Sequence, residues 1–147
     1  MSLTILPVTA LDYDDLIPLV EKYRGFYKQH PSERTSAYIA ARLDAGEAVG
    51  FIARLESCAI GFTLCYPAYS TVALAPIWLL NDLYVEENYR GQGIASKLMQ
   101  AAETAARDAG AARIWLRTAH DNIPAQRLYE GRGWGQDAVF RRYDLIF

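Results

Sequence analysis

Apolar and polar positions change period several times along the first half of the chain. Residues 3–8 have the short apolar pattern of an opening strand, and apolar positions from 16 to 23 then recur at helical spacing. A second helix is expected to end at Gly46, because glycine readily adopts the left-handed conformation that closes a helix. The segments 48–54 and 58–66 follow as strands, and the short connection between them predicts an antiparallel hairpin.

The second half of the chain continues the alternation of strands and helices. Its predicted segments are, in order, a loop at 66–70, a strand at 77–85, a helix at 93–109, a strand at 113–117, a helix at 124–132 and a closing strand at 140–146. The strand at 77–85 is apolar on both faces, which is typical of the centre of a sheet.

The predicted order of elements, β-α-α-β-β-β-α-β-α-β-β, indicates a mixed α+β fold. The strand–helix–strand unit at 77–117 is expected to be a right-handed parallel crossover, whereas the hairpins at both ends are expected to be antiparallel. The fold class is therefore a largely antiparallel central sheet with helices on both faces. A length of 147 residues predicts a single domain over 1–147.

Composition and charge exclude several classes of protein. Apolar residues make up 52% of the chain and charged residues 22%, as in ordinary globular domains. The net charge of −2 and the pI of about 5.7 leave no basic surface for nucleic acid. The N-terminus lacks the pattern of a signal peptide, and the longest apolar run, 72–80, is too short to span a bilayer. We therefore expect a soluble, cytoplasmic protein that binds neither nucleic acid nor membrane.

The two cysteines, Cys58 and Cys65, lie in one predicted strand. Side chains an odd number of residues apart point to opposite faces of a strand, so a disulfide between them is not expected. Neither has a metal-type spacing, and we expect no metal site. Both are interpreted as small buried side chains in a reducing compartment.

The turn between the strand at 77–85 and the next helix has the composition of a phosphate-binding site. A helix N-terminus presents backbone N–H groups without internal partners and carries the positive end of the helix dipole. Small residues at Gly91, Gly93 and Ala95 let phosphate oxygens approach the backbone, and Arg90 adds a positive charge. The expected phosphate-binding residues are Arg90, Gly91, Gln92, Gly93, Ile94, Ala95 and Ser96. The alternative is that the glycines only make a tight turn.

Two common phosphate-binding motifs fit this turn poorly. A Walker loop requires Gly-Lys-Ser/Thr, which is absent. A dinucleotide-binding fingerprint requires a third glycine where Ser96 stands, and it usually opens the fold. Asp121 lies too far along the chain to be a convincing ribose ligand. A nucleotide-binding or oxidoreductase domain is therefore the weaker interpretation.

The sequence around this turn resembles the GCN5-related N-acetyltransferase (GNAT) superfamily. The central motif of that family, Arg/Gln-x-x-Gly-x-Gly/Ala, is matched by Arg90, Gly93 and Ala95. A second motif, Asn-x-x-Ala-x-x-Leu-Tyr-x-x-x-Gly-Trp/Phe, is matched by Asn122, Ala125, Leu128, Tyr129, Gly133 and Trp134. The resemblance covers 78–134, and the predicted order of elements agrees with that of the family.

The resemblance implies a GNAT fold and acetyl-CoA as the cofactor, with its diphosphate at the turn. In the family the pantetheine arm pairs with the strand before the turn, here at Leu83, Tyr84 and Val85. Tyr129 matches the position of the general acid, and a phenol with a pKa of about 10 can donate a proton to a thiolate of comparable basicity. Asn122 is interpreted either as a hydrogen-bond partner of the cofactor arm or as a helix cap.

Asn81 and Asp82 are polar residues in an otherwise apolar strand, so burial requires them to find partners. Alternation predicts that their side chains face opposite sides of the sheet. The stretch 80–85 resembles spermidine/spermine acetyltransferases, in which a glutamate thought to relay protons stands at the place of Asn81. Asparagine cannot accept a proton, although Asn81 can still hold a water molecule. Asp82 is interpreted either as the general base or as an anchor for a loop.

The resemblance implies that the first two helices and the loop before the central strand shape the acceptor site. These segments supply Tyr23, Tyr27, His30, Glu33, Tyr66, Tyr69 and Trp78. Of these, His30 is interpreted as a surface residue, and the tyrosines as a set suit a small, partly apolar amine. The predicted substrate-binding residues are Tyr27, Glu33, Tyr66, Tyr69 and Trp78.

The predicted activity is therefore transfer of acetyl from acetyl-CoA to a primary amine of a small molecule, such as an amino acid or a polyamine. One alternative is a protein or peptide acetyltransferase, and another is an acyl-CoA sensor without catalytic activity. The resemblance also implies a homodimer as a possible assembly, in which the closing strand pairs or packs across the interface.

Overall fold

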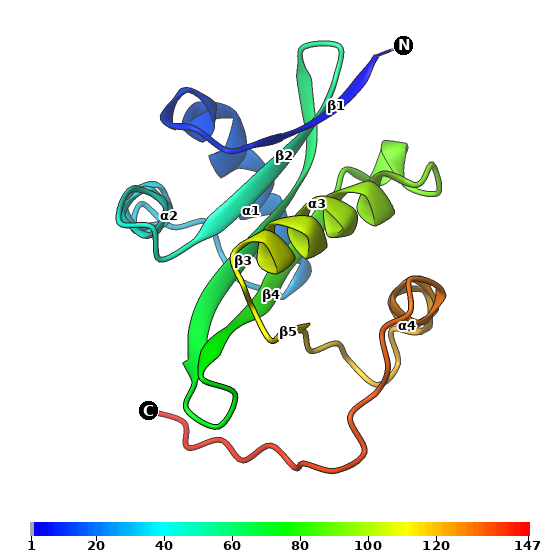
Figure 1. The fold of residues 1–147 in the computed structure, drawn as a ribbon. Helices are drawn as coiled ribbons and strands as arrows, with labels where there is room; N and C mark the ends of the chain where they lie inside the picture. The colour runs from blue at the N-terminus through cyan, green and yellow to red at the C-terminus, as the bar shows by residue number, and fades with distance from the viewer. Residues whose placement is uncertain (1) are drawn as a thin grey trace. The chain divides into compact units, whose positions relative to one another are not determined.

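The computed structural model describes residues 2–147, which form two compact units. The first unit ends at Arg117 and contains the whole β-sheet, and the second unit spans Thr118–Phe147. Figure 1 follows the chain from the N-terminus in blue to the C-terminus in red.

A five-stranded sheet forms the centre of the first unit, with the strands in chain order. The strands are β1 (Leu3–Pro7), β2 (Val49–Leu55), β3 (Cys58–Ser70), β4 (Ala75–Val85) and β5 (Arg113–Trp115). Neighbouring strands are antiparallel from β1 to β4, and β5 pairs with β4 in parallel. The predicted largely antiparallel sheet with one parallel crossover is confirmed.

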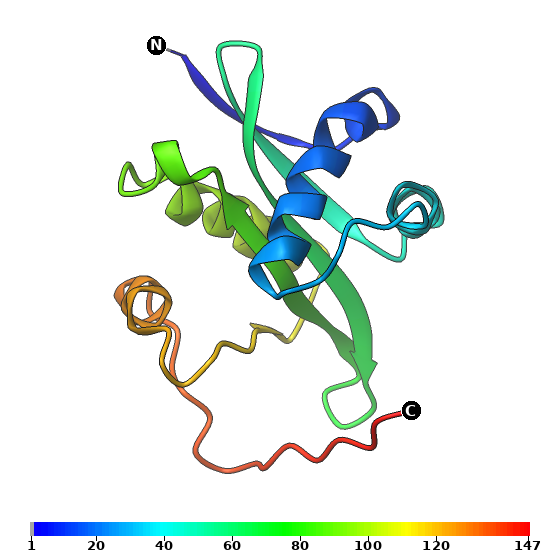
Figure 2. The ribbon, with the colours of Figure 1, turned by 180° about the vertical axis from the view of Figure 1, so that it is seen from behind.

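Helices cover both faces of this sheet. The helices of the first unit are α1 (Tyr13–Phe26), α2 (Thr35–Asp44) and α3 (Ile94–Asp108), and α4 (Ile123–Gly131) belongs to the second unit. Short 3-10 turns at Ala10–Asp12 and Glu87–Tyr89 precede α1 and α3. The helices α1 and α2 lie on one face of the sheet and α3 lies on the other, as Figures 1 and 2 show from opposite sides. The mixed α+β class is thereby confirmed.

Alternation along β2 divides the core into two layers. Ile52 packs in the cluster that includes Leu16 of α1 and Ile39 of α2, whereas its neighbours Phe51 and Ala53 pack in the cluster of α3. Successive side chains of a strand point to opposite faces, so a central strand with helices on both sides must be apolar at every position. The sheet is thereby held between two buried layers, with the end of β4 leading into the start of α3.

The strand β3 is longer than the sequence pattern predicts. The segment 66–70, expected as a loop, continues the strand and pairs with β4, with Tyr66 opposite Leu79 and Ser70 opposite Ala75. Pro67 argued against a strand, because it has no amide hydrogen to donate. Beyond Cys65, however, β3 no longer pairs with β2. This part of β3 is therefore an edge, where proline is tolerated.

The predicted closing strand at 140–146 and the antiparallel hairpin around it are absent from residues 2–147. After Gly133 the chain has neither helix nor strand. Two backbone amides here, those of Val139 and Phe140, donate instead to the Asp137 carboxylate, at 2.9 and 3.3 Å. Such local side-chain bonds compete with strand pairing. The prediction of a closing strand is therefore wrong, because a strand also needs a partner edge, which an apolar pattern does not supply.

Both cysteines are free. Cys65 is fully buried, as expected, whereas Cys58 is exposed because it is the first residue of β3, directly after a turn. Along residues 2–147, every helix is too short or too polar to cross a bilayer.

Candidate functional site

The turn between β4 and α3 has a backbone that only glycine adopts readily. Gly91 has a φ of 75° and Gly93, the N-cap of α3, has a φ of 79°. A Cβ atom added at either position would meet no heavy atom within 4 Å. The glycines are therefore required by the backbone conformation rather than by crowding. The space in front of both residues is open to a ligand.

Backbone amides at the start of α3 face this open space without helical partners. The first bond of the helix joins the Lys97 amide to the Gly93 carbonyl, at 3.2 Å. The amides of Ile94 and Ala95 precede it, so no carbonyl within the helix can accept from them. They also lie at the positive end of the helix dipole. An anion fits this position on chemical grounds.

The side chain of Arg90 anchors the turn to the end of β4. Its Nε donates a hydrogen bond to the Val85 carbonyl at 2.8 Å, and its guanidinium lies 5.5 Å from the centroid of the Tyr84 ring. These contacts hold a positive charge beside the turn. The arginine thus has a positioning role that the sequence motif alone did not reveal.

One edge of β4 is unpaired along its second half. Within residues 2–117, β5 pairs only with Ile77–Leu79 of β4, so the stretch 80–85 has β3 on one side and no strand on the other. The predicted residues Leu83, Tyr84 and Val85 lie in this open stretch. Unpaired N–H and C=O groups along a strand can accept an extended ligand that carries amides.

Asn81 is the extra residue of a β-bulge in β4. Leu64 pairs with Asp82 and Cys65 pairs with Leu80, so Asn81 has no opposite residue on β3. The Nδ2 atom of the Asn81 side chain donates a hydrogen bond to the Asp82 carboxylate at 2.9 Å. The prediction that the two side chains face opposite sides of the sheet is therefore wrong. An inserted residue breaks the alternation and brings neighbouring side chains together.

The Asp82 carboxyl lies in a mostly buried environment beside this bulge. Burial raises its pKa from 3.8 to about 6, and the hydrogen bond from the Asn81 side chain opposes the rise. A carboxyl of this kind is ionised at neutral pH and titrates close to it. Perturbed groups of this sort are candidates for proton transfer.

Two hydroxyl groups fix the backbone at the bulge. The Tyr23 hydroxyl donates to the Asn81 carbonyl at 3.1 Å, and the Thr63 hydroxyl donates to the Asp82 carbonyl at 2.8 Å. The Tyr23 ring packs edge-on against Phe62 and Tyr84. Thr63 is fully buried and was not singled out by the sequence analysis. Its only signal was a polar residue inside an apolar strand.

The five predicted substrate-binding residues do not form one site in the structure. Tyr66 and Tyr69 line one groove of about 550 Å³ on the side of α2. Tyr27 packs against Tyr23 and remains 54% exposed, and Glu33 is exposed just before α2. Trp78 is only 5% exposed and belongs to the core. The structure thus brings together only two of the five predicted side chains.

The Tyr66–Tyr69 groove contains two further residues of interest. Tyr38 and Arg42, four residues apart on α2, lie on its wall. Neither was predicted as a site residue, although an aromatic and an arginine at this helical spacing are a recognisable pair.

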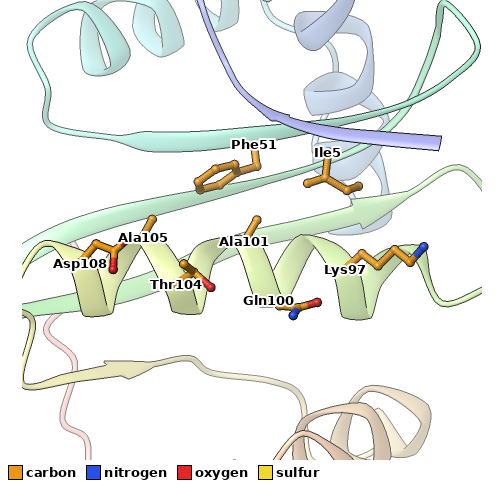
Figure 3. Close-up of a pocket in the computed structure, with 8 residues that line it drawn as sticks. All are labelled: Ile5, Phe51, Lys97, Gln100, Ala101, Thr104, Ala105 and Asp108. Atoms are coloured by element: carbon orange, nitrogen blue, oxygen red, sulfur yellow. The ribbon is translucent and has the colours of Figure 1, made fainter. Parts of the chain in front are cut away.

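Another groove, of about 500 Å³, lies on the α3 side of the sheet (Figure 3). Its lining residues are Ile5, Phe51, Lys97, Gln100, Ala101, Thr104, Ala105 and Asp108. None of these is a predicted site residue, and we assign no part of the acceptor site to this groove.

In the second unit, the Asn122 carboxamide caps α4. Its Oδ1 accepts from the Ala125 amide at 3.3 Å, and Pro124 occupies the first turn. The helix-cap interpretation of Asn122 is therefore confirmed, and its contact with a cofactor stays a prediction. Tyr129 lies on α4 with its ring centroid 6.3 Å from that of Trp134. Both residues belong to the second motif.

Comparison with known proteins identifies the family. The sequence model of the acetyltransferase (GNAT) family matches residues 14–134. The chain belongs to the GNAT family. It is 38% identical over 131 residues to the uncharacterised N-acetyltransferase YhfO of Bacillus subtilis, and the match covers 88% of each chain.

This GNAT protein is also similar to a named enzyme and to a solved structure. It is 37% identical over 86 residues to the thialysine N-ε-acetyltransferase of Bos taurus, a match that covers 52% of this chain and 50% of the bovine one. A crystal structure of a probable acetyltransferase superposes with a TM-score of 0.93 and 35% identity, covering 98% of this chain and 97% of the other. The resemblance drawn from the two sequence motifs is confirmed.

As a GNAT member, the chain is an N-acetyltransferase that uses acetyl-CoA as its acetyl donor. The residues present fit this cofactor. The open glycine backbone and the helix start suit a diphosphate, and the unpaired edge of β4 suits an arm with amide groups.

Proposed function

We propose that this GNAT enzyme acetylates a primary amine of a small molecule, with Asp82 as the general base. The observation that carries this proposal is the position of the Asp82 carboxyl at the β4 bulge, beside an unpaired strand edge. The pKa of this carboxyl lies near neutrality. That edge leads directly to the glycine turn before α3. A proton acceptor and a cofactor-sized binding edge therefore occur together on one strand.

The proposed cofactor contacts follow the chain from strand to helix. The backbone at Leu83, Tyr84 and Val85 would bind the pantetheine arm. The diphosphate would be bound at the turn by Arg90, Gly91, Gln92, Gly93, Ile94, Ala95 and Ser96. Asn122 is proposed as a further contact from the second unit. When bound, acetyl-CoA supplies the thioester that the amine attacks.

The proposed acid–base chemistry uses two residues. An alkyl ammonium has a pKa of about 10.4, so a substrate amine must lose a proton before it can attack. Asp82 accepts that proton, while Asn81 orients the carboxylate through their hydrogen bond of 2.9 Å. Tyr129 is the proposed proton donor, on the strength of its place in the second motif.

Support for a small-molecule acceptor comes from two directions. One relative acts on thialysine, a small amine, according to its name. The Tyr66–Tyr69 groove is of a size that suits a ligand of that kind.

The experiment that tests the proposed function measures release of free CoA thiol with a panel of amino acids, diamines and peptides, with the acetylated product identified by mass spectrometry. We expect thiol release with small amines and much less with Asp82→Asn. Release with peptides alone would instead indicate a protein acetyltransferase. Tight acetyl-CoA binding with no release for any amine would indicate a sensor.

We also propose that the chain forms a homodimer through its C-terminal segment. Six large apolar side chains in this segment are each at least 80% exposed: Val139, Phe140, Tyr143, Leu145, Ile146 and Phe147. A segment that exposes so many large apolar side chains is a candidate interaction surface. The sheet order ends at β5, whose outer edge offers a strand-pairing site to the segment of a second copy.

A further inference from the structure

The groove lined by Tyr66 and Tyr69 contains an arginine without a hydrogen-bond partner at Nε. Arg42 lies in the last turn of α2, with its guanidinium 4.9 Å from the centroid of the Tyr38 ring. Its Nε is buried and makes no hydrogen bond within residues 2–147. This nitrogen forms an ion pair with Glu47, whose carboxylate oxygen lies 3.5 Å from it. This distance is too long for a good hydrogen bond.

A buried N–H donor without an acceptor is unfavourable, so a ligand that supplies an acceptor would be stabilised at this position. The guanidinium of Arg42 lies over the Tyr38 ring, and its N–H groups can bind a planar anion. A carboxylate matches this geometry. Glu47, with a side chain that is 58% exposed, stands near the position that a ligand carboxylate would take and can swing into solvent.

Tyr66 connects this groove with the proposed base. It lines the groove, and its pKa is raised by burial and by the charge of Asp82 and lowered by the charge of Arg42. Both charges are therefore close to one phenol. Leu64 lies opposite Asp82, and Tyr66 is two residues further along β3, a distance of about 7 Å. The groove residue Tyr66 is thus only two strand positions from the residue that faces the proposed base across the sheet.

We propose that Arg42 binds the carboxylate of the acceptor, and that the acceptor is an amino acid whose side-chain amine is presented to Asp82. This proposal rests on the proposed function and specifies its substrate class. It distinguishes a substrate that carries an amine and a carboxylate from a polycationic amine, for which Arg42 would be repulsive. Glu47 competes with the substrate carboxylate for the same guanidinium.

The test compares lysine with 1,5-diaminopentane, which is lysine without its carboxylate. In Arg42→Gln we expect KM for lysine to rise about tenfold or more, because a charge-assisted hydrogen bond is lost, with a far smaller change for the diamine. In Glu47→Gln we expect KM for lysine to fall instead, because the competing carboxylate is removed. Arg34→Gln, which removes an exposed arginine at the start of the same helix, is the matched control and should leave both values unchanged.

A second measurement is independent of turnover. Hexanoate carries the carboxylate without an amine, and we expect it to shift the Nε–H signal of Arg42 in a ¹⁵N correlation spectrum, whereas hexylamine should not. Equal effects of Arg42→Gln on both amines, or an Arg42 signal that hexanoate does not move, would overturn the proposal. If no amine is acetylated but hexanoate still moves this signal, the proposed function fails and the carboxylate site stands.

Discussion

Asp82, the proposed general base, is expected to weaken the fold at neutral pH, because its carboxyl is mostly buried. Its pKa is about 6 in the folded protein, because burial disfavours the charged form, against 3.8 ordinarily. Below about pH 4 the carboxyl is protonated in both states. Between about pH 4 and 6 the unfolded chain ionises first, so the free energy of unfolding falls with rising pH. Above about pH 6 the carboxyl is ionised in both states, and the free energy of unfolding is then lower by about 3 kcal/mol than at acid pH.

We therefore predict that Asp82→Asn is more stable than the wild type at pH 7, by up to about 3 kcal/mol, and nearly equal to it below pH 4. The same variant should have much lower turnover. Denaturant titrations at both pH values and a thiol-release assay measure these effects. A variant that is destabilised equally at both pH values, or that keeps wild-type turnover, contradicts the role given to Asp82.

Tyr129→Phe removes only the proposed proton donor. We expect it to lower kcat by about 10²-fold or more, a typical contribution of general acid catalysis, with little change in acetyl-CoA affinity. Tyr143→Phe is the matched control, because it likewise removes only a hydroxyl and keeps the ring proposed to pack in the dimer, so it should be silent in the assay. Wild-type turnover of Tyr129→Phe across the pH range would remove Tyr129 from the mechanism.

At the residue scale, the sequence identified Asn81 and Asp82 as unusual but placed them wrongly. Their polarity inside an apolar strand is visible in the sequence. The bulge that brings them together depends on the register of β3 against β4, which is a non-local property. For the same reason Arg42 passed unnoticed, since its surroundings come from β3 as well as α2.

At the scale of elements, the glycines at the two ends of α3 provide a controlled test of the cofactor turn. Gly93 and Gly110 have φ values of 79° and 77°, and an added Cβ meets nothing within 4 Å at either position. Replacement by alanine should therefore destabilise the fold similarly, by about 1–2 kcal/mol each. Only Gly93→Ala should also weaken acetyl-CoA binding, by about tenfold or more, because it places a methyl group where a phosphate would approach.

Calorimetric titration of both variants with acetyl-CoA, together with thermal unfolding, measures this pair of effects. Equal affinities for acetyl-CoA in the two variants would indicate that the turn only connects β4 to α3.

Element boundaries were predictable where a local residue determines them. The helices end close to their predicted positions because Gly46, Gly110 and Gly133 adopt positive φ just after them. The extension of β3 through Pro67 was not predictable, because it depends on which edge of the strand is left without a partner.

At the scale of the whole molecule, the C-terminal segment departs most from the sequence prediction. Its apolar residues suggested a strand, yet in the single chain they are exposed and unpaired. Pairing partners lie outside any local pattern, so alternation alone cannot supply them. The GNAT match over residues 14–134 includes residues of both units.

The proposed homodimer predicts that charge on this segment produces monomers. The double variant Phe140→Glu and Ile146→Glu removes two apolar side chains that are 81% and 85% exposed, and it should halve the mass measured by light scattering. Arg141→Glu changes the net charge of the same segment by the same amount, −2, without removing an apolar side chain, and it should remain dimeric. A wild-type protein that is monomeric at high concentration contradicts the dimer.

The central claim is that the backbone amides at the start of α3 bind the diphosphate of coenzyme A. Its most direct test is a ¹⁵N correlation spectrum recorded with coenzyme A and, separately, with pantetheine, which lacks the diphosphate. The account predicts large amide shifts at Gly91, Gly93, Ile94 and Ala95 with coenzyme A, and little change at these positions with pantetheine. If coenzyme A binds while these four amides stay unmoved, the cofactor lies elsewhere and the proposed site is wrong.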